Sequence, residues 1–285
     1  MIWQQFANGL AIGSVYALIA LGLTMVYGVL RILHIAHAGV YALGAYVGLL
    51  VFRFIPNFWL ALAITMVASS FAGIILQRYL YAPLLALPRI VPLIASIGLF
   101  IAMEEIFRLI AGPYILAFPA DPGLGGIEWG IVRITNNQFL VFLVTVSLLA
   151  TLWFVMSKTK LGLAMKATSQ DLEIASVMGI NTERIIATNF LIGSALAGAA
   201  GVLVGVYFNS VYPTMGSIPA YKALAIIVLG GLGSIPGTVL GGLLIGLGET
   251  LLLGLINIPF PRDALAFIIM IIILMFRPYG LLGKE

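Results

Sequence analysis

The sequence predicts an all-α fold: a polytopic transmembrane bundle of about eight or nine helices, some of them broken or re-entrant. Hydrophobic residues make up 62% of the chain and charged residues 8%, whereas soluble domains carry about 25% charged residues. The apolar runs are long and continuous, as in spanning helices, and lack the two-residue alternation of a transmembrane β-barrel. The chain has no cysteine, which excludes disulfides and thiolate metal sites.

Each spanning helix needs about 20 apolar residues. The expected spans are 6–29, 38–55, 58–80, 90–111, 138–156, 186–208, 219–233, 236–256 and 263–276. The second, seventh and last of these are short or interrupted by glycine, which is typical of re-entrant or half helices. Glycine-rich, interrupted segments near 34–48 and 216–242 lie in opposite halves of the chain, as in transporters built from two related halves. We expect one permease domain over residues 1–285.

The distribution of Lys and Arg predicts the orientation in the membrane. Segment 157–185 is the most basic loop, so we place it in the cytoplasm. Alternation of the spans puts Arg78, Arg89, Arg277 and Lys284 on the same side, and the segment 112–137 outside. The net charge of +4 is assigned to these loops, because no basic cluster with interleaved aromatic residues indicates nucleic-acid binding.

The loop 157–185 contains a helix pattern over residues 168–179. Thr168 and Asp171 resemble N-terminal caps, Glu173 suits the first turn, and Gly179 is expected to end the helix. One face carries small residues that would permit close docking to another protein; this face consists of Leu172, Ala175, Ser176 and Gly179. From the residues alone, docking and an amphipathic loop on lipid headgroups are both open.

His34 and His37 are the two histidines of the chain, and they lie three residues apart. A metal site is disfavoured because no cysteine or carboxylate is near them in the sequence. The stretch could begin a half helix that faces the translocation path. The alternative is that these histidines are structural and bond the backbone.

The segment 222–242 combines glycines with Pro236, which we expect to break the helix. Its exposed backbone could serve as a gate or could simply allow tight helix crossing. Lys222 precedes the segment and could extend to the membrane interface. Glu249 lies inside an apolar run, where it could line the path or bond a neighbouring helix.

Motifs for catalysis are missing from the sequence. It lacks the Gly-x-x-x-x-Gly-Lys-Ser/Thr phosphate loop, the His-Glu-x-x-His zinc motif and the Gly-x-Ser-x-Gly nucleophile elbow. The chain is therefore predicted not to be an enzyme, and an energy source must come from elsewhere.

The stretch Glu173–Gly179 resembles the cytoplasmic coupling signature of ABC importer permeases. The chain as a whole resembles the branched-chain amino acid ABC transporter permease family, of the LivH type. The residues that carry this resemblance are His37, Val40, Tyr41, Gly44, Tyr46, Lys222, Ala223 and the stretch 229–242. His34, Ala38 and Gly39 depart from that family's usual residues, which leaves the exact cargo open.

The resemblance implies a multi-pass permease of the cytoplasmic (inner) membrane that translocates branched-chain or other small amino acids delivered by an extracytoplasmic binding protein. It implies a second permease subunit and two ATPase subunits that bind ATP and Mg²⁺, with no cofactor on this chain. The implied ATPase-coupling residues are Asp171, Glu173, Ala175, Ser176 and Gly179. The candidate path or gate residues are His34, His37, Gly44, Gly231, Gly233, Pro236, Gly237 and Glu249. The alternatives are urea, a short amide or a sugar as cargo, or an ion-coupled secondary carrier.

Overall fold

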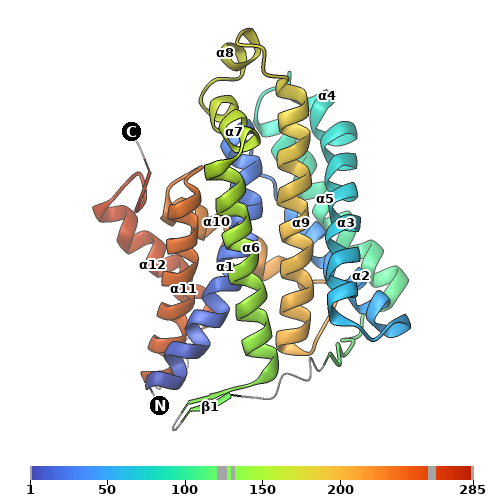
Figure 1. Ribbon diagram of the computed structural model, residues 1–285, viewed down its shortest axis with the longest axis vertical. Coiled ribbons are helices and arrows are strands. Elements are labelled where there is room, and N and C mark those ends of the chain that lie inside the picture. The colour runs from blue at the N-terminus through green and yellow to red at the C-terminus, as the bar shows by residue number, and fades with distance from the viewer. Residues whose placement is uncertain (1, 121–126, 130–131, 256–260, 284–285) are drawn as a thin grey trace.

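A computed structural model describes residues 2–120, 127–129, 132–255 and 261–283. They form an elongated helical bundle with the two ends of the chain at opposite ends of the long axis (Figure 1). The elements are α1 Ile2–Leu30, α2 His37–Phe54, α3 Phe58–Ile75, a π-helical turn Leu76–Tyr81, α4 Ala82–Leu84, α5 Ile90–Ala111, β1 Ile127–Trp129, β2 Val132–Ile134, α6 Asn136–Lys158, α7 Lys160–Gln170, α8 Leu172–Val177, α9 Thr182–Phe208, α10 Ser217–Gly230, α11 Ile235–Leu255 and α12 Arg262–Phe276.

Seven helices of the described part are long and apolar enough to cross a membrane, counting α3, the π-helical turn and α4 as one. Two shorter apolar helices, α10 and α12, accompany them. The expected polytopic helical bundle is thus confirmed, and the seventh and last of the expected spans are short helices, as predicted. The second, α2, was also expected to be short or broken but is long enough to cross a membrane. A departure from the all-α expectation is the antiparallel pair β1–β2, which lies at the end of the bundle opposite α8 (Figure 1).

Helix α1 is the central helix of the bundle. In its most apolar stretch 89% of the residues are buried, against 22% in α5. It packs against α11, α9, α10 and α6. Because α1 is surrounded, its sequence is apolar on every side and has no polar face, as expected of a fully buried helix.

Two helices begin inside the bundle instead of at its ends. An irregular link over residues 31–36 precedes α2, and a loop over residues 209–216 precedes α10. The two starts meet, because a Cβ atom at Gly216 would lie 2.6 Å from the carbonyl oxygen of Ala38. Ala38, Phe100 and Ala220 form a small apolar cluster around this point. Irregular backbone at this depth is shielded by protein, as lipid surroundings require.

The two halves of the bundle pack in equivalent ways. Helix α1 packs against α11 as α9 packs against α3, and α10 packs against α1 as α2 packs against α9. Exchange of α1, α2, α3 and α5 for α9, α10, α11 and α12 therefore preserves the main contacts. Since α1 and α9 run in opposite directions (Figure 1), this is the arrangement of an inverted repeat.

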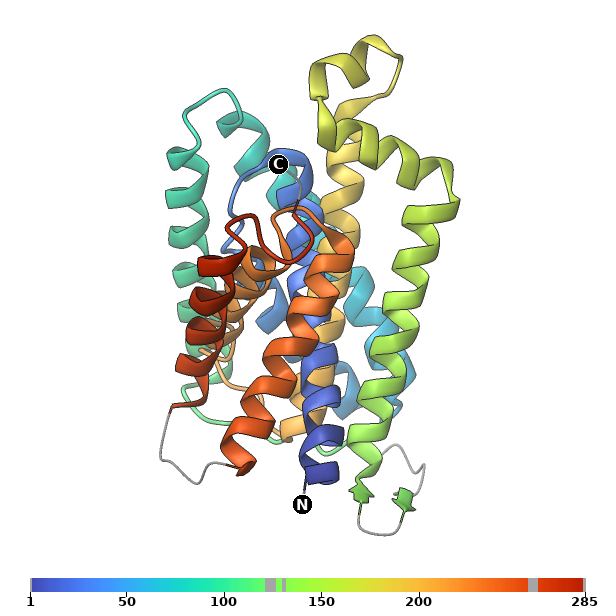
Figure 2. The same ribbon diagram turned by 90° about the vertical axis from the view of Figure 1, so that its left-hand side faces the viewer.

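Basic residues gather at one end of the bundle. The loops and helix ends that carry Arg78, Arg89 and Arg277 lie at the same end as α7 and α8 (Figures 1 and 2). This agrees with the predicted orientation, in which that end faces the cytoplasm. Lys284, assigned to the same side, lies outside the described residues.

Glycines allow the helix backbones to touch. A Cβ atom at Gly22 would lie 2.6 Å from the carbonyl oxygen of Gly193, which marks the crossing of α1 and α9. Gly44 meets the backbone of Gly198 where α2 crosses α9, and Gly246 meets Gly13 where α11 crosses α1. Small residues at crossings are the main means by which helices pack closely in lipid.

Substitution of Gly44 by Ala should destabilise the protein by about 1–3 kcal/mol, because the new methyl group overlaps the backbone of Gly198 and the helices must separate. Thermal unfolding in detergent measures this as a lower midpoint. The matched control is Gly98→Ala on α5, where a Cβ atom meets none of the described residues within 4 Å. Equal midpoints for the two variants would contradict the packing described for Gly44.

Candidate functional site

The cytoplasmic tip consists of two helices, where the sequence predicted one. The expected helix over residues 168–179 is wrong, because the chain breaks at Asp171. Thr168 lies inside α7, and its hydroxyl donates to the carbonyl oxygen of Ala164 at 2.8 Å. Asp171 is extended, with φ of −153°. Its carboxylate accepts from the amides of Glu173 and Ile174 at 2.8 and 2.9 Å, which makes it the N-cap of α8.

Gly179 ends the second of these helices, as predicted. Its φ is +85°, in the left-handed region that glycine adopts without a Cβ clash. The amide of Gly179 donates to the carbonyl of Ser176, and the amide of Ile180 donates to that of Ala175. These two bonds form a Schellman motif, which satisfies the last carbonyls of α8.

The exposed apolar face of α8 differs from the predicted one. Ala175, expected to dock to a partner, is buried against the protein itself. Leu172 of the predicted face is 39% exposed, but the most exposed apolar side chains are Ile174, Val177 and Met178, at 63%, 82% and 77%. Sequence reasoning missed them, although their spacing of three and four residues is that of a helix face. Helix α8 projects beyond the ends of the spanning helices (Figure 2).

His34 and His37 fix the link between α1 and α2 to its neighbours. Nδ1 of His34 lies 2.5 Å from the hydroxyl of Tyr81, and its ring packs against Tyr81 and Phe190. Nε2 of His37 donates to the carbonyl oxygen of Ile19 at 3.2 Å. Both histidines are buried and line a cavity of about 10 Å³, which is large enough for about one water molecule.

The predicted glycine gate is a tight connection between α10 and α11. Gly231 and Gly233 have φ of +102° and +82°. The helix break lies at residues 231–234 and not at Pro236, as the sequence suggested. Pro236 is the second residue of α11, where a residue without an amide hydrogen is tolerated. Gly237 packs directly on the backbone of Gly230.

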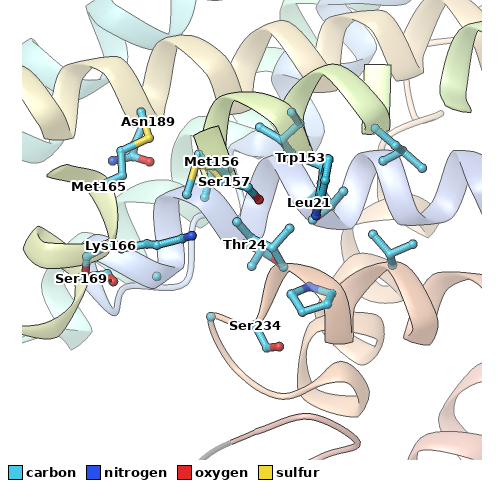
Figure 3. Close-up of a pocket in the computed structure, with 18 of the residues that line it drawn as sticks. Leu21, Thr24, Trp153, Met156, Ser157, Met165, Lys166, Ser169, Asn189 and Ser234 are labelled. Carbon is cyan, nitrogen blue, oxygen red and sulfur yellow. Dashed lines mark hydrogen bonds between the residues drawn. The ribbon is translucent and has the colours of Figure 1, made fainter. Parts of the chain in front are cut away.

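A cavity of about 870 Å³ opens in the cytoplasmic half, between α1, α6, α7 and α11. Gly233, Ser234 and Pro236 line one side of it, and Trp153 lines the other. Figure 3 shows Lys166 extending from α7 toward α1 at this cavity. Most of the lining is apolar, and its polar side chains include Lys166 and Ser169 of α7 and Thr24 of α1. The cavity has the size of a small-molecule site.

Lys222 and Glu249 form a buried ion pair, which corrects the expected position of Lys222 at the membrane interface. The side chains are 3% and 0% exposed, and Nζ lies 2.8 Å from Oε1 of Glu249. Nζ also donates to the hydroxyl of Tyr16 at 2.8 Å and pairs with Asp263 at 2.9 Å. Of the two roles considered for Glu249, the structure shows the bond to a neighbouring helix. The pair connects α10 with α11, and the hydrogen bond from Lys222 to Tyr16 connects α10 with α1 as well.

The eight candidate path or gate residues therefore fall into four places. Gly233 and Pro236 line the large cavity, and His34 and His37 line the small one. Gly231, Gly237 and Gly44 make backbone contacts, and Glu249 is in the ion pair. Their part in translocation stays a prediction.

The fold and these features define a class: a multi-pass transport protein of the inner membrane with a helical tip that projects beyond the spanning helices. The chain belongs to the family described as branched-chain amino acid transport system / permease component, whose family model matches residues 5–275. It is thus a permease subunit of an ABC importer and not itself an enzyme. The family predicted from the sequence is confirmed.

Three curated relatives illustrate the similarity. The chain is 37% identical to the high-affinity branched-chain amino acid transport system permease protein BraD of Pseudomonas aeruginosa, over 99% of the chain and 95% of the relative. It is 34% identical to LivH of Escherichia coli, with the same coverage. LivM of that bacterium, a permease protein also described as part of a high-affinity branched-chain amino acid transport system, is 27% identical over 94% of the chain and 68% of LivM.

Among solved structures, the chain resembles PsaBC from Streptococcus pneumoniae in complex with Fab. The TM-score is 0.50 with 10% identity, over 94% of this chain and 89% of the other. At this identity the likeness concerns the fold alone.

Replacement of Lys222 by Met should cost about 3–5 kcal/mol of stability, because it leaves the carboxylate of Glu249 buried without its cation. Thermal unfolding of the purified chain measures the loss. The double variant Lys222→Met with Glu249→Leu removes both charges and should recover most of it. A double variant as unstable as the single one would show that the ion pair does not account for the effect.

Proposed function

We propose that this permease imports branched-chain or other small amino acids, delivered by an extracytoplasmic binding protein and driven by two separate ATPase subunits that bind ATP and Mg²⁺. The cargo rests on the names of the relatives, which are transport proteins for branched-chain amino acids. External ATPases are supported by the sequence, which contains no phosphate-binding loop of its own.

The observation that carries the ATPase proposal is the apolar tip of α8. Ile174, Val177 and Met178 are exposed to water on a short helix that projects from the cytoplasmic end. Burial of such side chains yields about 1.5–3 kcal/mol each, so a groove on a partner that covers them would bind this tip. The five predicted coupling residues fit this role indirectly: Asp171 and Gly179 cap the helix, and Ala175 seats it on the protein. Glu173 and Ser176 are exposed beside the apolar face.

A displacement of α8 can reach the centre of the bundle through direct contacts. Helix α8 packs against α7 and α9, and α7 packs against α1, α6 and α9. Helix α7 also borders the 870 Å³ cavity. In this mechanism, ATP-driven movement of the ATPases shifts α7 and α8 as a unit, and the bundle changes between outward and inward access. The energy comes from the different affinity of nucleotide for the two states.

We further infer that the membrane core contains a second permease subunit. The support is that two permease proteins of Escherichia coli, LivH and LivM, are both similar to this chain. A heteromeric core in which two related permeases each present one tip to one ATPase accounts for both similarities. The lipid bilayer surrounds the rest of the bundle.

Replacement of Val177 and Met178 together by Asp should abolish copurification of the ATPases with the tagged permease from native membranes, because the apolar contact is lost. Mass spectrometry of the mild-detergent extract measures this. The matched control is Leu87→Asp, an exposed apolar residue of the α4–α5 loop at the same end. Undiminished ATPase recovery with the double Asp variant would refute docking through α8.

The cargo proposal has its own test. Uptake of radiolabelled leucine into proteoliposomes that contain the full complex should require ATP and the binding protein. Unlabelled valine and isoleucine should compete, whereas urea, short amides and sugars should not. Uptake by the permease alone in an ion gradient would instead identify a secondary carrier.

A further inference from the structure

A second sizeable cavity lies in the half of the bundle away from α8. It encloses about 430 Å³ between α1, α2, α10, the start of α12 and the loop before α10, a volume within the usual range of small-molecule sites. It is separate from the 870 Å³ cavity, with which it shares no lining residue. Apolar walls come from Ile19, Met215 and Ile218, and polar groups from Tyr16, Tyr41, Lys222 and Asp263.

The negative charges at this cavity outnumber the positive ones. Lys222 is neutralised by Glu249 behind it, and it holds a second carboxylate, Asp263, at 2.9 Å. The side chain of Asp263 is 48% exposed, whereas that of Glu249 is 0% exposed. Asp263 is therefore the partner that can be exchanged. With three charges in the group, one negative charge remains on the cavity side.

Tyr41 supplies an unused hydrogen-bonding group. The residue is 0% exposed, and its hydroxyl has no hydrogen-bond partner among the residues that the structure describes, a state that costs about 1–3 kcal/mol when a polar group is buried. Tyr41 lines the cavity, so a bound molecule can satisfy it. Tyr46, five residues further along α2, also has a buried hydroxyl without a partner in the described part of the chain, but it does not line the cavity.

We propose that this cavity is a site on the import path that binds the zwitterionic head of an α-amino acid. The cargo binds between Lys222 and Asp263. Its carboxylate pairs with the ammonium of Lys222 and accepts a hydrogen bond from the hydroxyl of Tyr41, and its ammonium pairs with the carboxylate of Asp263. The ring of Tyr16, already 4.7 Å from Nζ of Lys222, adds a face suited to a cation. The apolar side chain of the cargo lies against Ile19, Met215 and Ile218.

This arrangement requires both charges of the ligand. A carboxylic acid without an amine leaves Asp263 unpaired beside the ligand's own negative charge. An amine without a carboxylate pairs with Asp263 but makes no contact with Lys222 or with the hydroxyl of Tyr41, so it binds more weakly than the amino acid. Binding breaks the ion pair between Lys222 and Asp263 and forms two ion pairs with the ligand. The net gain is therefore small and the affinity stays modest, as release of the cargo toward the cytoplasm requires. The inference rests on the proposed amino acid cargo.

The chain contains no cysteine, so a single introduced cysteine reports on the site. Ile218→Cys places a thiol at the cavity, and Leu240→Cys places one at the 870 Å³ cavity; the native side chains are 45% and 46% exposed. Each full-length variant in nanodiscs is treated with N-ethylmaleimide in the presence of L-leucine, isoamylamine or isocaproate. The amine lacks the carboxylate of leucine, and isocaproate lacks its ammonium.

Leucine at about ten times its dissociation constant should slow modification of Ile218→Cys about tenfold. At the same concentration isocaproate should leave the rate unchanged, and isoamylamine should slow it less than leucine does. Modification of Leu240→Cys should not respond to leucine. In the Ile218→Cys background, Tyr41→Phe should raise the leucine concentration for half-protection about fivefold, the effect of one lost hydrogen bond. Asp263→Asn should raise it further, and the matched control Tyr46→Phe should not change it.

Three results would overturn the proposal: no protection of Ile218→Cys by leucine, equal protection of Leu240→Cys, or protection by isoamylamine as strong as that by leucine. The alkylation assay uses neither ATPases nor the binding protein. The cargo itself is tested by the proteoliposome uptake experiment: leucine uptake without protection of Ile218→Cys refutes this site alone, whereas absence of leucine uptake refutes the cargo proposal.

Discussion

Direct contact between helix backbones is the constraint on which the rest of this structure depends. Lipid offers no hydrophobic force to drive helices together, so packing requires surfaces that approach closely. Gly22 against Gly193, Gly44 against Gly198 and Gly13 against Gly246 bring α1, α2, α9 and α11 together. This tight centre shields the irregular links before α2 and α10, whose backbone polar groups could not face lipid. The same centre fixes the inverted halves relative to each other.

Few charged side chains lie inside this centre, and those that the structure describes there are paired with an opposite charge. Lys222 and Glu249 connect α10 with α11, the two helices that meet through Gly230 and Gly237. A buried pair of this kind contributes little net stability but fixes which helices face each other, because either charge alone is costly. Asp263 differs in being exposed, and this difference gives the outer cavity a polar group that a ligand can reach.

The two ends of the bundle are suited to different partners. The cytoplasmic tip presents apolar side chains on a helix that is capped at its two ends by Asp171 and Gly179. A helix fixed in this way is rigid and can transmit a displacement. The outer cavity offers paired charges and a free hydroxyl, which suit a small polar molecule. Helix α1 connects the two regions: Thr24 lines the inner cavity, Tyr16 lines the outer one, and α7 packs against α1 on the cytoplasmic side.

The sequence by itself determined the class and most of the spans, because hydrocarbon selects apolar runs of fixed length. The distribution of its basic residues predicts which end faces the cytoplasm. The sequence also located the cap at Gly179, since only local backbone geometry is involved. It placed Lys222 wrongly, gave α7 and α8 as one helix, and missed Ile174, Val177 and Met178. Whether Lys222 reaches water or Glu249, 27 residues away, depends on how α10 packs against α11. Which residues enclose the two large cavities was likewise decided only by the tertiary structure, because each cavity lies between helices that are distant in the chain.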